Sequence, residues 1–334
     1  MSYLATDSTG QLTAQITRLL RDESNDNIPL LLEMIEGGGV NRCILGYLFG
    51  IAVFHPLKNI ADKALNLLRK HAGVATLRQA EKLKEGAAYH YNETEYLGKY
   101  RNPEFDIFDF ILANKMCLWH RAGASRSPYF EVSHRTLNLS LYPEQVFSEA
   151  ISTLNFIQFI TLPASKQFDL DAAIPMLMPL PLENVYLENL RLEYFPTGLF
   201  ALPKLKVLSI KKGNYRPRAP MSVRSEGTTM GSASLEKLEI DGYTIEKGAA
   251  LGPFPALIEA DLTRCGLEHI DFLEKSTRLS RLNLKSNDLK ELPSFMGQLT
   301  QLRWLDLSNN PFKILHLDLS ELYQLEHFEV KLGK

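Results

Sequence analysis

The 334-residue sequence has few cysteines, no excess of charge of either sign and no long apolar segment. Cys43, Cys117 and Cys265 are odd in number and far apart, which excludes a disulfide framework and favours a reducing compartment. Lys and Arg number 37 against 39 Asp and Glu, a balance that argues against a dedicated nucleic-acid binder. The longest apolar run, residues 43–54, is too short to span a bilayer.

Targeting signals and catalytic motifs are also missing. Residues 1–10 contain neither a basic stretch nor an apolar one, so we predict no secretory signal and expect a cytoplasmic protein. The sequence has no P-loop, dinucleotide-binding, zinc-protease or nucleophile-elbow motif. The glycine run at residues 37–39 follows a helical pattern and is interpreted as a helix stop. We therefore predict no enzyme activity, no cofactor and no metal.

The first third of the sequence has the apolar spacing of helices. The pattern predicts helices at about residues 11–21, 27–37, 41–54, 57–71, 76–88 and 105–120. Short helices joined by Gly or Pro turns resemble HEAT-like helical repeats over residues 27–72. Residues 121–133 are small and polar, so we place a boundary there. The predicted domains are a helical domain at 1–125 and a second domain at 126–334.

Leucine is roughly one residue in six, and after that boundary it recurs at a fixed period. The clearest turns run from Leu279 to Pro293 and from Leu302 to Leu315, with the pattern LxxLxLxxNxLxxL and Phe312 in one leucine position. The first leucines of successive turns are Leu182, Leu205, Leu235, Leu257, Leu279, Leu302 and Leu325, at spacings of 23, 30, 22, 22, 23 and 23 residues.

This periodicity resembles that of leucine-rich-repeat proteins of the bacterial type. The resemblance implies an α/β fold: a leucine-rich-repeat solenoid with a parallel sheet on its concave face, preceded by the all-α helical domain. About nine strands are expected, the first two near residues 137–139 and 157–159. Asn287 and Asn310 hold the buried bend position, where the amide must bond backbone groups of adjoining turns.

Two Cys–His pairs have spacings that a metal site could use. Cys265 with His269 is one, but Cys265 falls at the bend position, where cysteine commonly replaces asparagine. Cys117 with His120 is the other, one helical turn apart. Neither pair is accompanied by a second pair with ligand spacing, so we interpret both as structural.

The spacing of 30 residues marks an insertion at residues 213–234. It contains Arg216, Arg218 and Arg224, two prolines and no periodic apolar pattern. It is either a loop that binds a partner or an anion, or a surface excursion with no role in binding.

Side chains alternate across a strand, so the residues flanking each first core leucine face the concave side. One column reads Asn184, Val207, Lys237, Glu259, Arg281, Trp304 and His327, and the next reads Tyr186, Ser209, Glu239, Asp261, Asn283, Asp306 and Glu329. An aromatic side chain surrounded by polar groups is typical of an interface hot spot. We therefore predict a partner-binding site made of Trp304, Arg281, His327, Asp306, Asn283, Asp261, Glu239 and Tyr186. The alternative is a solvated sheet whose charges cancel laterally.

The sequence thus predicts a non-enzymatic protein–protein interaction module, an adaptor or binder that uses the concave face. Two alternatives stay open. One is a regulatory or immunity subunit that inhibits or positions a separately encoded enzyme or toxin. The other is an enzyme whose site lies in the helical domain, marked by a cluster of groups with shifted pKa values. The expected partner is a protein, not a nucleic acid or a membrane.

The last turn, at Phe328 and Val330, lacks a polar cap, which offers a route to a homo-oligomer through the C-terminal end.

Overall fold

The computed structural model describes residues 5–21, 27–55, 57–86, 102–106, 108–109, 135–139, 145–163, 168–188, 196–212, 231–245, 251–312 and 320–331. The chain divides into two compact units. The helical unit comprises Met1–Arg135 with Phe147–Phe156, and the repeat unit comprises Thr136–Val146 with Ile157–Lys334. The predicted boundary at 125/126, the pair Cys117 and His120, and residues 213–230 of the insertion lie outside the described residues.

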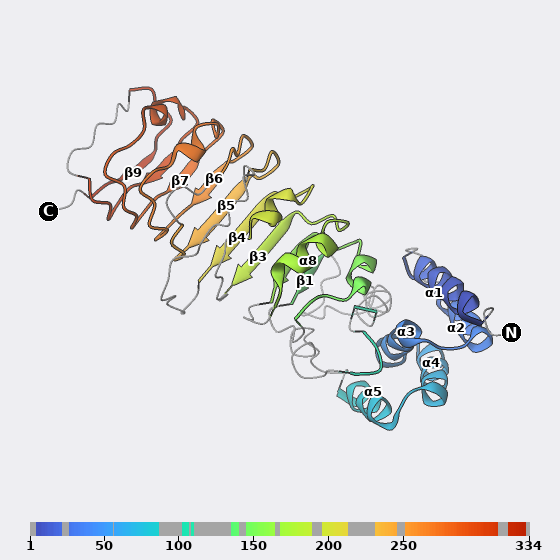
Figure 1. Ribbon diagram of the computed structural model, residues 1–334. Helices are drawn as coiled ribbons and strands as arrows, with labels where there is room; N and C mark the ends of the chain where they lie inside the picture. The colour runs from blue at the N-terminus through green and yellow to red at the C-terminus, as the bar shows by residue number, and fades with distance from the viewer. Residues whose placement is uncertain are drawn as a thin grey trace. The chain divides into compact units, whose positions relative to one another are not determined.

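The described part of the helical unit contains the α-helices α1 (Ala5–Arg21), α2 (Asn27–Gly38), α3 (Arg42–Phe54), α4 (Lys58–His71) and α5 (Val74–Gly86) and the 3-10 helix η1 (Glu149–Thr153) (Figure 1). Helix α3 packs against α4 and α5, and α2 packs against α1 and α4. The side chain of Asn41 accepts a hydrogen bond from the Ile44 amide and so caps α3. The predicted helices at 11–71 are confirmed, and none of the described helices is long and apolar enough to cross a membrane.

Two helix boundaries differ from the prediction. Helix α1 begins at Ala5 rather than residue 11, because the helix continues through Gly10, which a helix interior tolerates at about 1 kcal/mol relative to alanine. Helix α5 begins at Val74 because the Glu104 carboxylate accepts a hydrogen bond from the Gly73 amide at 3.0 Å, just before the first turn. Of the predicted helix at 105–120, residues 108–109 are helical, and those after 109 lie outside the described residues.

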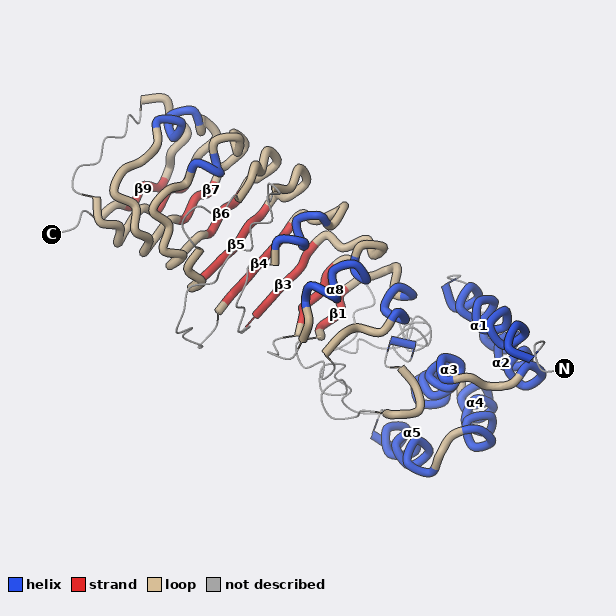
Figure 2. The backbone as a smooth tube through the Cα atoms, viewed as in Figure 1, coloured by secondary structure: helices blue, strands red, loops and turns tan. Residues whose placement is uncertain are grey.

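The repeat unit contains a nine-stranded parallel sheet in which each strand pairs with the next one along the chain. The strands are β1 (Thr136–Asn138), β2 (Phe159–Leu162), β3 (Asn184–Glu188), β4 (Val207–Lys211), β5 (Lys237–Asp241), β6 (Glu259–Asp261), β7 (Arg281–Asn283), β8 (Trp304–Asp306) and β9 (His327–Glu329). Helix α8 (Leu170–Leu177) and the 3-10 helices η2 (Thr197–Ala201), η3 (Asp271–Leu273) and η4 (Ser294–Gln298) lie in the connections that return from one strand to the next (Figure 2).

The core of the repeat unit is built from the periodic leucines, as the spacing predicts. Leu282, Leu284, Leu305 and Leu307 have no exposed surface. Strand β2 begins two residues later than predicted, because Ile157 holds the first apolar position of its turn while Ile160 and Leu162 are the inward pair on the strand. The predicted leucine-rich-repeat solenoid is confirmed by this sheet and its repeating core.

Each regular turn bends sharply just after its strand. The residue before the bend position has a positive φ in three successive turns, at Arg264, Ser286 and Asn309, with values of 57–58°. This left-handed conformation reverses the chain so that the next residue, Cys265, Asn287 or Asn310, points into the core. Cys265 has no exposed surface and its Sγ donates to the Ile240 carbonyl at 3.1 Å, which confirms its place at the bend.

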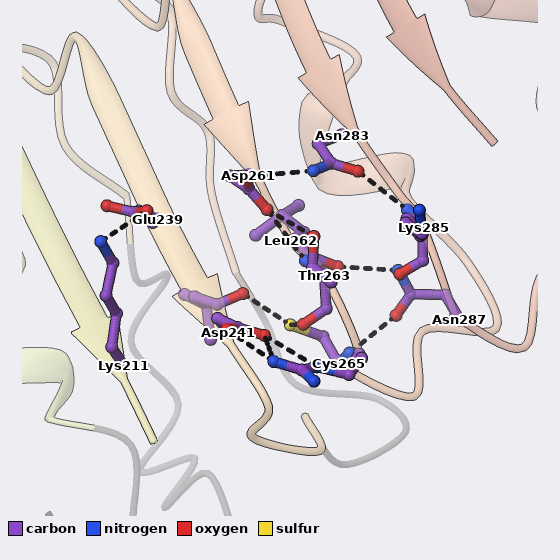
Figure 3. Close-up of polar contacts among 12 residues, drawn as sticks. Lys211, Glu239, Asp241, Asp261, Leu262, Thr263, Cys265, Asn283, Lys285 and Asn287 are labelled. Atoms are coloured by element: carbon purple, nitrogen blue, oxygen red, sulfur yellow. Dashed lines mark hydrogen bonds and ion pairs between the residues drawn. The ribbon is translucent and has the colours of Figure 1, made fainter. Parts of the chain in front are cut away.

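Asn287 joins the backbone of two successive turns (Figure 3). Its side-chain oxygen accepts from the amides of Cys265 and Leu267 at 2.9 and 3.1 Å. Its amide nitrogen donates to the carbonyls of Leu262 and Leu284 at 2.7 and 2.8 Å. Asn310 repeats this arrangement one turn later, so buried backbone groups that no strand would satisfy are bonded by side chains.

Candidate functional site

The sheet presents two columns of side chains on the face opposite its leucine core, which we call the open face. Strand pairing places Arg281, Trp304 and His327 at equivalent positions on β7, β8 and β9. The second column continues through Asn283, Asp306 and Glu329. The same register extends back to Asn184 and Tyr186 on β3, so the two predicted columns are present as derived from the sequence.

Charges in the middle of the open face are paired between neighbouring strands. The Lys211 ammonium lies 3.0 Å from the Glu239 carboxylate (Figure 3), and the Lys237 ammonium lies 2.9 Å from that of Glu259. The hydrogen bond to Glu259 raises the pKa of Lys237 above its usual value. Because these groups already hold partners within the sheet, the middle strands match the alternative of a solvated face with lateral charge cancellation.

Asp261 and Asn283 are also held within the face (Figure 3). The Asn283 amide donates to one Asp261 oxygen at 3.0 Å, and the Thr263 hydroxyl donates to the other at 2.6 Å. Glu239 accepts in addition from the Ser209 hydroxyl at 2.9 Å. These three predicted site residues therefore form part of a fixed polar lattice rather than a set of free groups.

Trp304 lies between two cationic or ionisable side chains. The Arg281 guanidinium carbon is 3.8 Å from the centre of the indole ring. On the neighbouring strand, the His327 ring lies 5.0 Å from the indole, with an angle of 8° between the planes. We call Arg281, Trp304 and His327 the stack. It half-buries the indole while Arg281 and His327 stay exposed, and cation–π attraction favours the arrangement.

Asp306 and Tyr186 do not share the exposed surface of the stack. Asp306 is only 4% exposed and its carboxylate accepts from the Ser308 amide at 2.8 Å, so the free protein does not present this predicted site residue on its surface. The physical reason is that the short Asp-x-Ser bend turns the carboxylate onto its own backbone. Tyr186 is half-buried and lies five strands from Trp304, roughly 24 Å away at the usual strand spacing. The structure therefore brings together Trp304, Arg281 and His327 and separates Tyr186 from them.

A buried polar cluster in the helical unit was not predicted from the sequence. Asp109 is 1% exposed and accepts hydrogen bonds from the side chains of Cys43 and Tyr47, which are one helical turn apart on α3. Burial is the main reason that the pKa of Asp109 rises to about 6 and that of Cys43 to about 12. A nucleophilic cysteine needs a lowered pKa, so these shifts run against a role for Cys43 in covalent catalysis.

This cluster predicts a dependence of stability on pH. The folded protein keeps a proton on Asp109 up to about pH 6, whereas the unfolded chain releases it near the ordinary value of 3.8. The free energy of unfolding should therefore fall by about 3 kcal/mol as the pH rises across that interval. Denaturant titrations of the wild type and of Asp109→Asn across this interval measure the effect. A slope of the same size in Asp109→Asn would assign the pH dependence to other groups.

The part of the chain that the structure describes contains no cluster of side chains that could bind a metal ion. No group of three His, Cys, Asp or Glu side chains lies together there. Cys265 is fully buried, and burial raises the pKa of its thiol far above the usual value. His269 is exposed, so the pair Cys265 and His269 does not form a shared site.

The fold and the open face define a leucine-rich-repeat solenoid with a helical unit in the same chain. Among solved structures, a leucine-rich-repeat protein of Leptospira interrogans is similar, with 21% identity, a TM-score of 0.41, and 60% of this chain matched to 56% of that one. An internalin of Listeria monocytogenes matches at 14% identity and a TM-score of 0.30, over 56% of this chain and 66% of the internalin. Toll of Drosophila, in its complex with Spatzle, matches at 18% identity and a TM-score of 0.40, over 58% of this chain and 29% of Toll.

This chain therefore matches about half of the Leptospira protein and less than a third of Toll. No protein-family model and no curated protein matches the sequence. Because the TM-scores are low, the assignment of the fold rests on the repeat, the sheet and the asparagine bonds of this chain.

Proposed function

We propose that this protein is a non-enzymatic protein-binding module whose partner contacts the open face at β7, β8 and β9, centred on Trp304. The observation that carries the proposal is the stack, in which a large aromatic side chain is held rigid among exposed polar groups. Rigid aromatic and arginine side chains are the residue types most enriched at interface hot spots. The free thiols Cys43 and Cys265 fit a reducing compartment, and we place the module in the cytoplasm of a bacterial cell.

Paired charges elsewhere on the face support this choice of strands. The middle strands have their lysines and carboxylates bonded to one another, and a partner would have to break those pairs to use them. On the strands around the stack, the side chains of Arg281, His327 and Glu329 are exposed. The closest pairing among them is between His327 and the Glu329 carboxylate, at 3.9 Å. A partner can therefore contact this region without breaking a close ion pair of the sheet.

The replacement Trp304→Ala should weaken partner binding by about 2 kcal/mol or more, because it removes the anchor and releases both neighbours of the stack. The immobilised protein is used to capture partners from a lysate of the source cells, and the purified partner is then titrated by calorimetry. Thermal melts should show a nearly unchanged fold, since the indole is only half-buried.

The matched control is Tyr323→Ala, which removes another aromatic side chain, 74% exposed and outside the strands. It should leave binding unchanged. Equal binding by wild type and Trp304→Ala would refute the open-face site. If the captured protein is an enzyme or toxin whose activity falls on binding, the module acts as its inhibitor.

A further inference from the structure

Arg281 differs from the other strand cations of the open face in having no carboxylate. Lys211 and Lys237 each hold a glutamate on a neighbouring strand. In the described part of the chain, no Asp or Glu lies within ion-pair distance of Arg281, which contacts the indole of Trp304 instead. Lys285, just past the end of β7, is likewise without an ion pair to any described residue. Glu259, opposite Arg281 on β6, is paired with Lys237 instead. Strand β7 therefore carries positive charge that no ion pair with a described residue neutralises.

The contact with Trp304 prepares Arg281 to bind an anion. A guanidinium that stacks on an aromatic ring uses its flat face, and its five N–H donors point outward in the plane. The side chain is exposed, so these donors are accessible. Because the stack already restricts the long side chain, less conformational entropy is lost when a ligand binds.

The surrounding charges indicate which anion fits. Glu329 is exposed on β9, and Asp261 faces the same side from β6. A nucleic acid, with a phosphate at every step, would meet these carboxylates as well as Arg281. A protein segment with one acidic side chain between uncharged or basic residues would bring a single negative charge to Arg281, and its basic residues could face Asp261 and Glu329. A carboxylate also matches the fork of the guanidinium with two parallel hydrogen bonds.

We infer that the partner presents an Asp or Glu side chain to Arg281, which binds it in a bidentate salt bridge while stacked on Trp304. This inference rests on the function proposed above and names the chemistry of the partner. It assigns Arg281 the selection of an acidic protein segment and Trp304 the task of holding the guanidinium in place.

A random 12-residue peptide library displayed on phage supplies the probe, and selection is run on the wild type, Arg281→Met and Trp304→Ala. Arg278→Met is the matched control, because Arg278 is exposed in the same repeat but precedes β7. Peptides selected by the wild type and by Arg278→Met should be rich in Asp and Glu. Selection on Arg281→Met should lose this enrichment.

One selected peptide is then synthesised with its acidic residue as Glu and as Gln. The change to Gln should weaken binding to the wild type about tenfold, the usual size of a charge-assisted hydrogen bond. It should change binding to Arg281→Met by less than about twofold. Arg281→Lys, which keeps the charge but lacks the fork, should bind the Glu peptide more weakly than the wild type.

The outcomes separate the two proposals. If selected peptides bind Trp304→Ala poorly but are not acidic, or if Glu and Gln peptides bind equally, the carboxylate inference is wrong and the open-face site stands. If selected peptides bind wild type and Trp304→Ala equally, or if none is selected, both proposals are contradicted.

Discussion

Replacing Leu284 by alanine is expected to lower the free energy of unfolding by roughly 2–5 kcal/mol. Leu284 has no exposed surface. It directly follows β7 as the second inward leucine of its turn, and it lies between the equivalent leucines of the neighbouring turns. Because each turn of a solenoid buries its apolar residues only against its neighbours, the cavity would have little freedom to collapse. Urea denaturation of the purified variant measures the loss.

The same substitution at Leu292 provides the control within the repeat, since this leucine is half-buried and should cost distinctly less. Leu307→Ala, one turn later, should resemble Leu284→Ala. A loss below about 1 kcal/mol for either inward leucine would show that the repeat register is wrong.

Replacing Asn287 by alanine is expected to cost about 3 kcal/mol or more, because four hydrogen bonds are lost in a buried site. The amides of Cys265 and Leu267 and the carbonyls of Leu262 and Leu284 would each lose this partner. A buried polar group without a partner is destabilising by about 1–3 kcal/mol, less where water enters the space that the side chain leaves.

Asn283→Ala is the matched control, because this asparagine is half-buried on the open face and makes two side-chain bonds there: its amide donates to Asp261 and its oxygen accepts from the Lys285 amide. It should change the free energy of unfolding by less than about 1 kcal/mol. Equal losses for the two variants, measured in the same urea titrations, would mean that the bends are not held by buried side-chain bonds.

The regular part of the fold could be predicted because its information is local and repeated. In each turn the leucines, the bend residue and the spacing all indicate the same strand register. This register predicts that Arg281, Trp304 and His327 occupy one column of the sheet. The earliest turns have fewer leucines, which explains the two-residue displacement of β2. A helix start such as Ala5 depends on weak propensities and was placed less well.

The site could be predicted only in part because side-chain contacts are not periodic. The register placed Arg281 and His327 beside Trp304, but it did not indicate that both would stack on the indole. Asp306 has the right position and yet bonds its own bend, which depends on a local turn. The cluster of Asp109 with Cys43 joins residues far apart in the sequence, and no motif marks such a pair.

Self-association through the C-terminal end stays a prediction. Strand β9 pairs with β8, and within the described residues no strand covers its other edge. Exposed Glu329 on this strand places charge near that edge, which disfavours strand addition by a second copy.

Hydroxyl-radical footprinting of the captured complex tests the central claim most directly, because oxidation reports the accessibility of individual side chains. We predict that partner binding protects Trp304 and His327 from oxidation, while Tyr323, 74% exposed and outside the strands, reacts as in the free protein. Unchanged oxidation of Trp304 and His327, with new protection confined to the helical unit, would contradict the account.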